Sequence, residues 1–322
     1  MTIDQVNTKR DFDKSFYYEI VYEWEDVIAK NLHLQLYNEN PLLYNRIFKR
    51  LPLVITNLAN TKKNSFVFDM WPMLLHGVNN RKNIIPNIID FYVLPNELPV
   101  FYKNYSHNPI VLISSRQAYA YLQKYHAEQH IHFGHLALSL PDKYAITPKT
   151  HFRKKYDLVL TGRNNDPVLN KFLEQYEQEN PDFSYVKSNP QKGYQLYDNR
   201  GNRAGSTKSR EEYMNLMKQA RAAFYIAHMV DYMDYPFHQI TPRFLEYVAC
   251  GCHILARYQE NEDSDFYELG KFSPNITEYS QFKGLMDKAR NEDVDMSMYS
   301  RYLEKHYTSC RTKELQSIIS NL

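Results

Sequence analysis

The stretch HQITPRFLEYVACGCHIL, residues 238–255, decides the fold. It predicts a helix with Thr241 as its N-cap and Pro242 at the first helical position, ending near Gly251. A short apolar strand over 253–256 follows at once. A helix that runs into a buried strand is the building block of a doubly wound α/β sheet, in which ligands dock at the carboxyl ends of the strands.

Two charged residues lie early in this helix. Arg243 is in the first turn and Glu246 follows three residues later, on nearly the same face. One interpretation is a phosphate site, in which Arg243 and the helix N-terminus bind an anion and Glu246 accepts hydrogen bonds from ribose hydroxyls. The other is an ordinary Arg243–Glu246 ion pair on an exposed helix. Spacing alone does not separate these two.

The flanking sequence repeats the alternation of strand and helix. Strands are expected over 156–163, 183–187 and 222–228, with helices over 167–179, capped by Asp166, and 211–221. The segment 188–210 is polar and contains three of the nine glycines, which predicts a loop.

The first half has the same character. Helices are expected over 15–31 and 42–51, and again over 116–125. Strands are expected over 32–37, 51–56, 65–70, 87–94, 109–115 and 130–136. Such alternation predicts an α/β protein with parallel sheets. A proline-containing basic segment then suggests a linker, so we expect domains over 1–140 and 156–296, a linker over 141–155, and a C-terminal helix over 297–322.

The segment TPRFLEYVACGCHIL resembles the donor-site signature of glycosyltransferases with the GT-B fold, in particular family 4 and the spore-maturation-type (CgeB-like) enzymes. Glu246 matches the second of the two glutamates of family 4, and the small residues Ala249 to Gly251 match those that follow it. His238 stands where that family has its first glutamate, which helps to hold the transferred sugar. KYDLVLTGR (155–163) resembles the first strand of the nucleotide domain.

The resemblance implies two Rossmann-like domains that face a cleft, with the C-terminal helix packing on the first domain. It implies a metal-independent hexosyltransferase whose donor is a nucleotide-diphosphate sugar and which needs no other cofactor. Its acceptor would be a glycan, a lipid-linked molecule or another hydroxyl compound in surface polysaccharide or glycoconjugate assembly. The expected donor-binding residues are Gly162, Arg163, Thr241, Arg243 and Glu246.

Three residues are candidates for the chemical step. His76 lies in the first half and is a candidate partner of the acceptor or the sugar; an ordinary structural histidine is the alternative. Asp69 ends an apolar run and is a candidate base for the acceptor hydroxyl if the enzyme inverts. His238, in place of the family glutamate, is the third. His228 and the tyrosine-rich segment 232–238 are further residues that could line the cleft, or belong to the core.

The composition and net charge of the chain argue against some classes of function. The chain has 322 residues, 39 Lys and Arg against 37 Asp and Glu, and a net charge of +2, which argues against a nucleic-acid-binding protein. The polar N-terminus and the three cysteines favour a cytoplasmic protein, with Cys250 and Cys252 as packing thiols rather than metal ligands. The sequence leaves open whether the basic cluster 149–155 contacts a membrane peripherally. It also leaves the oligomeric state open. The rival functions are a GT-B-fold epimerase or phosphorylase and a noncatalytic scaffold that binds a sugar or nucleotide.

Overall fold

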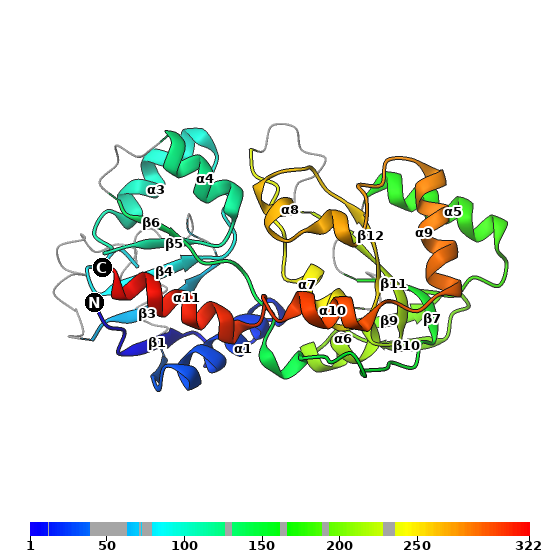
Figure 1. Ribbon diagram of the computed structural model, residues 1–322, viewed down its shortest axis with the longest axis horizontal. Coiled ribbons are helices and arrows are strands. Elements are labelled where there is room, and N and C mark those ends of the chain that lie inside the picture. Colours follow the sequence, from blue (N-terminus) through cyan, green and yellow to red (C-terminus); the bar gives the residue numbers. More distant parts are fainter. Residues whose placement is uncertain are drawn as a thin grey trace. The chain divides into compact units, whose positions relative to one another are not determined.

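The computed structural model describes residues 1–11, 13–38, 63–70, 72, 79–125, 131–161, 166–188, 193–227 and 236–322. The chain divides into two compact units (Figure 1). The first unit comprises 1–142, 232–239 and 306–322, and the second comprises 143–231 and 240–305.

The sheet of the first unit has six parallel strands in the order β2-β1-β3-β4-β5-β6. The strands are β1 (Gln5–Thr8), β2 (Gln35–Asn38), β3 (Ser65–Asp69), β4 (Ile84–Ile88), β5 (Val111–Ile113) and β6 (Phe133–His135). The chain places β2 on one side of β1 and β3 on the other. The carboxyl ends of β1 and β3 therefore flank the point where the strand order reverses.

Strand β1 was not predicted, although it is an inner strand of the sheet, between β2 and β3. Its sequence QVNT has a single apolar residue, Val6, yet all four residues are buried. The polar side chains satisfy one another, because Gln5 Nε2 donates to Asn7 Oδ1 at 3.2 Å and to Ser65 Oγ at 3.0 Å. A strand whose buried polar groups are paired across the sheet leaves no apolar pattern to detect.

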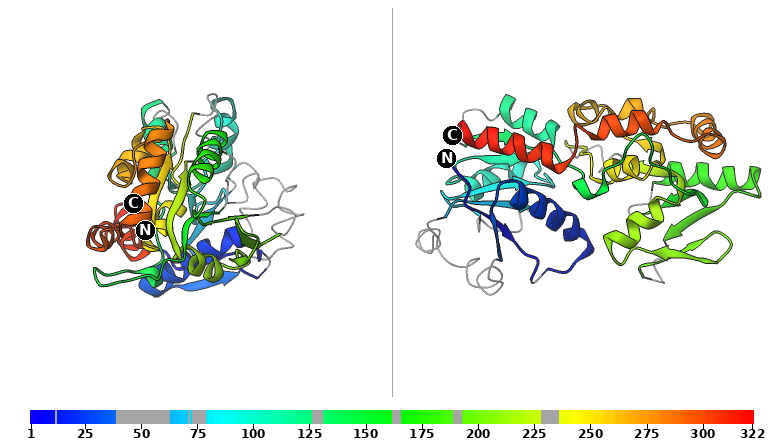
Figure 2. Two further views of the ribbon diagram at one scale, coloured as in Figure 1. Left: turned by 90° about the vertical axis from the view of Figure 1, so that its right-hand side faces the viewer. Right: turned by 60° about the horizontal axis from the view of Figure 1, so that its bottom comes forward.

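Helices cover both faces of this sheet (Figure 2). One face packs against α1 (Phe16–Asn31) and α11 (Thr308–Ser320), which also contact each other. The other face packs against α3 (Leu98–Tyr105) and α4 (Arg116–Tyr125), with the short 3-10 helix η3 (Pro95–Glu97) before α3. Neighbouring residues of β5 serve opposite faces, since Leu112 joins the first cluster and Val111 the second, as the strand pleat requires.

The sheet of the second unit has six strands in the order β10-β9-β8-β7-β11-β12. They are β7 (Tyr156–Leu160), β8 (Tyr185–Ser188), β9 (Gln195–Asp198), β10 (Arg203–Ser206), β11 (Ala220–Ile226) and β12 (His253–Arg257). Strands β8, β7, β11 and β12 are parallel, and β9 and β10 add an antiparallel edge.

The loop predicted over 188–210 is wrong in part, because it contains the β9–β10 hairpin. Asp198 organises the turn: its Oδ1 accepts from the backbone N–H of Arg200 at 3.1 Å and of Asn202 at 2.7 Å. Gly201 adopts a φ of 84°, which favours glycine. The strands pair through their backbone, and side-chain hydrogen bonds of Asp198 rather than apolar alternation fix the turn between them.

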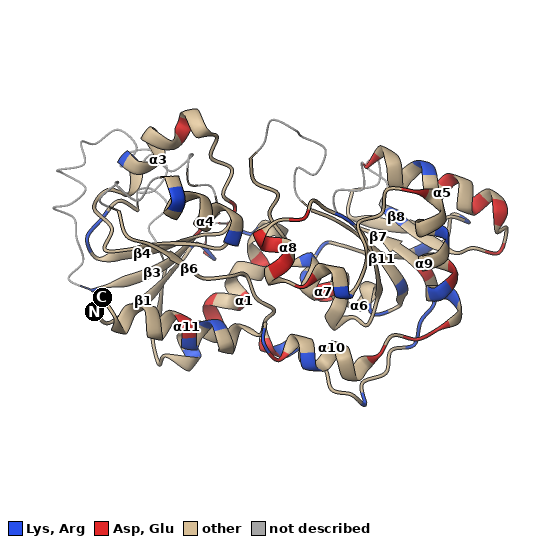
Figure 3. Cartoon of the chain, turned by 45° about the horizontal axis from the view of Figure 1, so that its top comes forward, with Lys and Arg blue, Asp and Glu red and all other residues tan. Residues whose placement is uncertain are grey.

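Helices also cover both faces of the second sheet. The helical segments are η4 (Asp142–Tyr144), α5 (Pro167–Glu179), α6 (Arg210–Met217), α7 (Arg243–Ala249), α8 (Glu262–Phe266), η6 (Leu269–Lys271), α9 (Tyr279–Asn291) and α10 (Met296–Leu303). The predicted N-cap of α5 is confirmed: Asp166 Oδ1 accepts from Leu169 N at 2.8 Å. Helices α5 and α9 share one cluster with the sheet, and their outer surfaces mix acidic and basic residues (Figure 3). Helices α6 and α7 contact β11 on the other face.

The single C-terminal helix expected over 297–322 is two helices. Helix α10 ends at Leu303 in the second unit, and α11 begins at Thr308 in the first. Between them Leu140 and Tyr307 form a parallel β-bridge within the first unit, which interrupts the helical backbone. Among the described residues, no helix is long and apolar enough to cross a membrane.

Candidate functional site

The strand order of the second unit reverses at β7. The chain runs from β7 to β8 on one side and returns to β11 on the other. The carboxyl ends of β7 and β11, marked by Thr161 and Tyr225, therefore flank the position at which open α/β sheets bind ligands. Helix α7 contacts β11, and its first residue is Arg243. The predicted donor segment thus lies at the expected edge of the sheet.

Arg243 carries a guanidinium that forms no salt bridge with the residues that the structure describes. Its Nη1 donates to the backbone carbonyl of Thr161 at 3.3 Å, and within the described residues its guanidinium pairs with no carboxylate. The side chain is only partly exposed. Burial works to lower the pKa of Arg243, but nearby tyrosines, Tyr247 first, and the negative charge of Glu246 raise it overall, so the group stays charged. A charged guanidinium with unused donors is suited to bind an anion bidentately.

Glu246 has a different partner from the one its spacing suggests. Its Oε1 accepts from Arg210 Nη1 at 2.8 Å and its Oε2 from the Tyr213 hydroxyl at 2.9 Å. Only 2% of Glu246 and 5% of Arg210 are exposed. The alternative of an exposed Arg243–Glu246 ion pair is therefore wrong on both counts.

Arg210 and Tyr213 were missed by the sequence analysis. Both lie on α6, three residues apart and hence on one face. The predicted helix over 211–221 begins one residue after Arg210, and its sequence contains no sign of a partner for this arginine on another helix. Burial raises the pKa of the Tyr213 hydroxyl well above its ordinary value, so it remains a donor to Glu246.

Thr241 is not the N-cap that was predicted. Pro242 occupies the cap position of α7, and no side chain caps the helix. Thr241 is held through its backbone instead, because its N–H donates to the Tyr225 hydroxyl at 2.9 Å. Its own Oγ1 is buried and makes no hydrogen bond within the part of the chain that the structure describes. This orphaned hydroxyl is two residues from Arg243.

His238 lies in the first unit, although the sequence analysis placed it in the second domain. It is 6% exposed, and its backbone N–H donates to Gln117 Oε1 at 2.9 Å. Its neighbours anchor the segment: the ring of Phe237 packs on Phe91 at 5.2 Å, and Gln239 exchanges two hydrogen bonds of 3.0 Å with the Phe91 backbone. The chain enters the second unit again at Ile240.

Asp69 ends β3 in the first unit and is fully buried. Its Oδ2 accepts from Asn79 Nδ2 at 2.9 Å and from the Tyr105 hydroxyl at 2.7 Å. Its Oδ1 is also buried and has no partner among the described residues. In this conformation Asp69 does not reach the surface, and its role as a base stays a prediction.

Several predicted residues cannot be placed. Gly162, Arg163, His76 and His228 lie outside the described residues, as do the tyrosines of the segment 232–235. The interpretation of the cysteines as packing thiols is confirmed for Cys250 and Cys252, which are fully buried and donate to backbone carbonyls. No group of three or more His, Cys, Asp or Glu that could hold a metal ion occurs in the described part of the chain.

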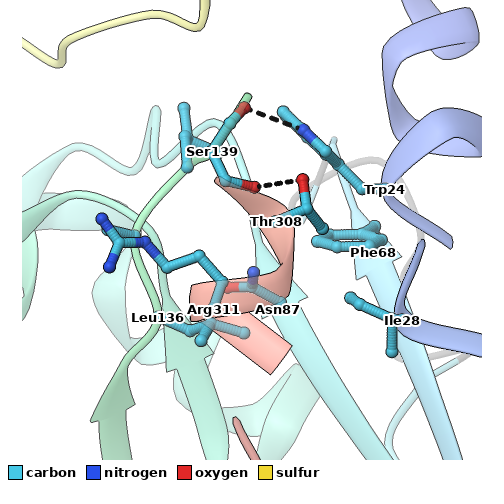
Figure 4. Close-up of a pocket in the computed structure, with 10 residues that line it drawn as sticks. Trp24, Ile28, Phe68, Asn87, Leu136, Ser139, Thr308 and Arg311 are labelled. Carbon is cyan, nitrogen blue, oxygen red and sulfur yellow. Dashed lines mark hydrogen bonds between the residues drawn. The ribbon is translucent and has the colours of Figure 1, made fainter. Parts of the chain in front are cut away.

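A small pocket opens in the first unit (Figure 4). Two hydrogen bonds border it, from Trp24 Nε1 to the Ser139 carbonyl at 2.9 Å and between the Ser139 and Thr308 hydroxyls at 3.0 Å. The buried Oδ1 of Asn87 has no partner among the described residues. The pocket has room for about one water molecule, so it does not hold a nucleotide.

Comparison with known sequences gives no match, either to a protein-family model or to a curated protein. Solved structures do match. Sucrose-phosphate synthase from Thermosynechococcus elongatus aligns with 100% of this chain and 99% of its own at 9% identity and a TM-score of 0.57. AviGT4, a glycosyltransferase involved in avilamycin A biosynthesis, aligns over 98% and 96% at 8% identity and a TM-score of 0.56.

The pneumococcal O-GlcNAc transferase GtfA, whose structure is in complex with UDP and GlcNAc, aligns with 83% of this chain at 11% identity and a TM-score of 0.52. The chain spans about 59% of the length of GtfA. At such low identities a likeness concerns the fold alone. The chain thus has two Rossmann-like α/β domains, the fold of GT-B glycosyltransferase structures.

Proposed function

We propose that this protein is a glycosyltransferase that moves a sugar from a nucleotide-diphosphate sugar to a hydroxyl acceptor. The observation that carries the proposal is Arg243 at the reversal point of the second sheet, where its guanidinium pairs with no carboxylate of the described residues. The fold shared with sucrose-phosphate synthase and AviGT4 supports it. So does the likeness to GtfA, whose structure contains UDP and GlcNAc.

In this proposal Arg243 binds the donor diphosphate. As the bond between the sugar carbon and the phosphate oxygen breaks, negative charge grows on the leaving diphosphate. A cation already fixed by Thr161 stabilises that charge without reorganising, which lowers the barrier. The acceptor oxygen forms the new bond to the sugar carbon and gives up its proton. Asp69, His76 and His238 remain the predicted candidates for groups that assist this step, and Gly162 and Arg163 remain predicted donor-binding residues.

The finer assignments rest on the sequence resemblance. We propose a hexosyl donor, an acceptor in surface polysaccharide or glycoconjugate assembly, and chemistry that needs no metal ion because Arg243 supplies the positive charge. The three cysteines are free thiols, which agrees with the proposed cytoplasmic location. Activity that is unchanged by a chelator would support the metal-independent mechanism.

The test is a panel of nucleotide sugars offered with and without hydroxyl acceptors. Product formation is followed by mass spectrometry and the anomeric configuration by NMR. We expect one donor to yield nucleoside diphosphate together with a glycosylated acceptor, and Arg243→Met to lose this activity by about tenfold or more.

The control variant is Arg290→Met. Arg290 pairs with Asp182 at 2.6 Å and with Asp157, at the amino end of β7, in the same unit. It should transfer sugar as the wild type does. Isomerised donor without an acceptor product would indicate an epimerase, sugar phosphate formation a phosphorylase, and donor binding without turnover a scaffold. Full activity of Arg243→Met would refute the site.

A further inference from the structure

Helix α7 carries two opposite charges that could pair with each other. Arg243 and Glu246 are three residues apart, and opposite charges at this spacing attract each other on a helix. If Glu246 closed on Arg243, the guanidinium would be neutralised and its donors would be occupied by the protein itself. An anion site that depends on Arg243 therefore requires something to hold Glu246 elsewhere.

Helix α6 supplies that restraint. Arg210 donates a hydrogen bond to one oxygen of Glu246 at 2.8 Å, and the Tyr213 hydroxyl donates to the other at 2.9 Å. Arg210 is itself fixed, since its guanidinium lies over the ring of Tyr144 with Cζ 5.6 Å from the centroid. Both partners are nearly fully buried, where an ion pair is screened little by solvent. Both donors to Glu246 thus come from α6, and not from its own helix, which carries Arg243.

We infer that Arg210 and Tyr213 are positioning residues that hold Glu246 away from Arg243, which keeps the Arg243 guanidinium free for the diphosphate of the donor. Only the choice of diphosphate as ligand rests on the proposed function. Glu246 then acts through its neighbours and does not touch the nucleotide. This differs from what the resemblance implies for Glu246, and it rests on the hydrogen bond that each oxygen of Glu246 accepts within the protein.

The net charge of Arg210, Arg243 and Glu246 also indicates that the guanidinium of Arg243 is left to bind an anion. Two guanidinium groups and one carboxylate leave a net charge of +1, and the free charge resides on Arg243. Without Arg210 the sum of these three charges falls to zero, and Arg243, three residues away on the same helix, is a cation to which the buried carboxylate can turn. Pairing of Glu246 with Arg243 then relieves the cost of an unpaired buried charge.

Two probes separate the parts of the ligand: inorganic pyrophosphate, which has the charge alone, and UDP, which adds the ribose. Their affinities for the full chain are measured by calorimetry. We expect Arg210→Met to weaken both by about tenfold or more, the value of a charge-assisted hydrogen bond. Arg210→Lys, which keeps the charge, should bind both within about threefold of the wild type.

The decisive result is rescue. Adding Glu246→Gln to Arg210→Met removes the competing carboxylate, so pyrophosphate affinity should return to within about threefold of the wild type. Near-UV circular dichroism at the assay temperature verifies that each variant is folded. If Arg210→Met does not fold, Tyr213→Phe takes its place, with a loss of about threefold that Tyr213→Phe/Glu246→Gln reverses. Arg290→Met serves as the matched loss of an ion pair and should bind normally.

Three results would overturn the inference. They are wild-type affinity in a folded Arg210→Met, no rescue in the double variant, and a Glu246→Gln variant that loses UDP but not pyrophosphate, which would show that Glu246 touches the ribose. Arg243→Met distinguishes this failure from that of the proposed function. If Arg243→Met still binds pyrophosphate as the wild type does, the diphosphate site is wrong; if only Arg210 proves indifferent, the diphosphate site stands.

Discussion

Glu25 predicts a pH-dependent stability for the first unit. This residue of α1 is only 2% exposed, and burial raises the pKa of its carboxyl to about 8 from the ordinary 4.5, against the opposing effects of Thr8 and Arg10. Arg10 is 3.4 Å from Glu25 but 2.9 Å from the exposed Asp26, so its charge is shared. The folded protein therefore holds a proton on Glu25 that the unfolded chain releases.

The sign and size of this change in stability with pH follow from the linkage between proton binding and folding. Because the pKa is higher in the folded state, the stabilisation is fully present below pH 4.5 and is lost as the pH rises toward about 8. At 1.36 kcal/mol per pH unit, the whole difference corresponds to about 5 kcal/mol, of which about 3 kcal/mol is gone at pH 7. Glu25→Gln keeps an oxygen acceptor but cannot ionise. Its free energy of unfolding should exceed that of the wild type by an amount that grows with pH.

The assay is urea unfolding between pH 5 and pH 8, followed by tryptophan fluorescence. Trp24 lies on α1 beside Glu25 and is 1% exposed, so its fluorescence reports on the first unit. With a urea dependence of about 2 kcal/mol/M, a difference of about 3 kcal/mol moves the midpoint by about 1.5 M. Asp26→Asn is the control, because it removes an exposed carboxylate that pairs with the same Arg10. A difference between Glu25→Gln and wild type that stays constant across this range would refute the reasoning.

Three backbone and hydrogen-bond features give further predictions. His33 is exposed with a φ of 54° after α1, so His33→Gly should raise the first unit's free energy of unfolding by about 0.5–1 kcal/mol, measured by urea unfolding. Gln239→Ala leaves both backbone groups of Phe91 unpaired and should cost about 2–4 kcal/mol by the same measurement, whereas an unchanged midpoint would contradict the anchoring of this segment. Gly251 has a φ of 61° and a Cβ there would lie 3.2 Å from an aromatic ring, so calorimetry should show a lower melting temperature for Gly251→Ala than for Gly193→Ala, which has a similar φ but open space.

Much of the layered fold was predictable because its core strands are apolar and its helices have signals at their ends. Asp166 before Pro167 marked the start of α5 correctly. The failures share a cause: β1 and the β9–β10 hairpin contain polar residues such as Gln5 and Asp198, whose side chains form hydrogen bonds and which leave no periodic apolar pattern. In the same way, the C-terminal helix is divided by a β-bridge to a residue far away in sequence, Leu140.

The site was predictable only in part. The sequence located Arg243 at a strand-to-helix junction, because α/β topology fixes where such junctions lie. It could not identify the partner of Glu246, since Arg210 is 36 residues away and the contact depends on how α6 and α7 pack on one sheet. It misplaced the cap at Thr241, because the Tyr225 hydroxyl binds the Thr241 backbone from a neighbouring strand.

The two buried glutamates show how neighbouring charges decide what a cluster can bind. Around Glu25, burial raises the pKa of the carboxyl and Arg10 is shared with a second carboxylate, Asp26, so the group that relieves the buried charge is a proton. Around Glu246, Arg210 pairs with the carboxylate and Arg243 adds a second guanidinium three residues away, so the excess is positive and the group that relieves it is an anion. Neither residue type nor burial separates the two cases, because each glutamate is 2% exposed. The difference lies in the count of partners, and this count is why an anion site is expected in the second unit and a titrating carboxyl in the first.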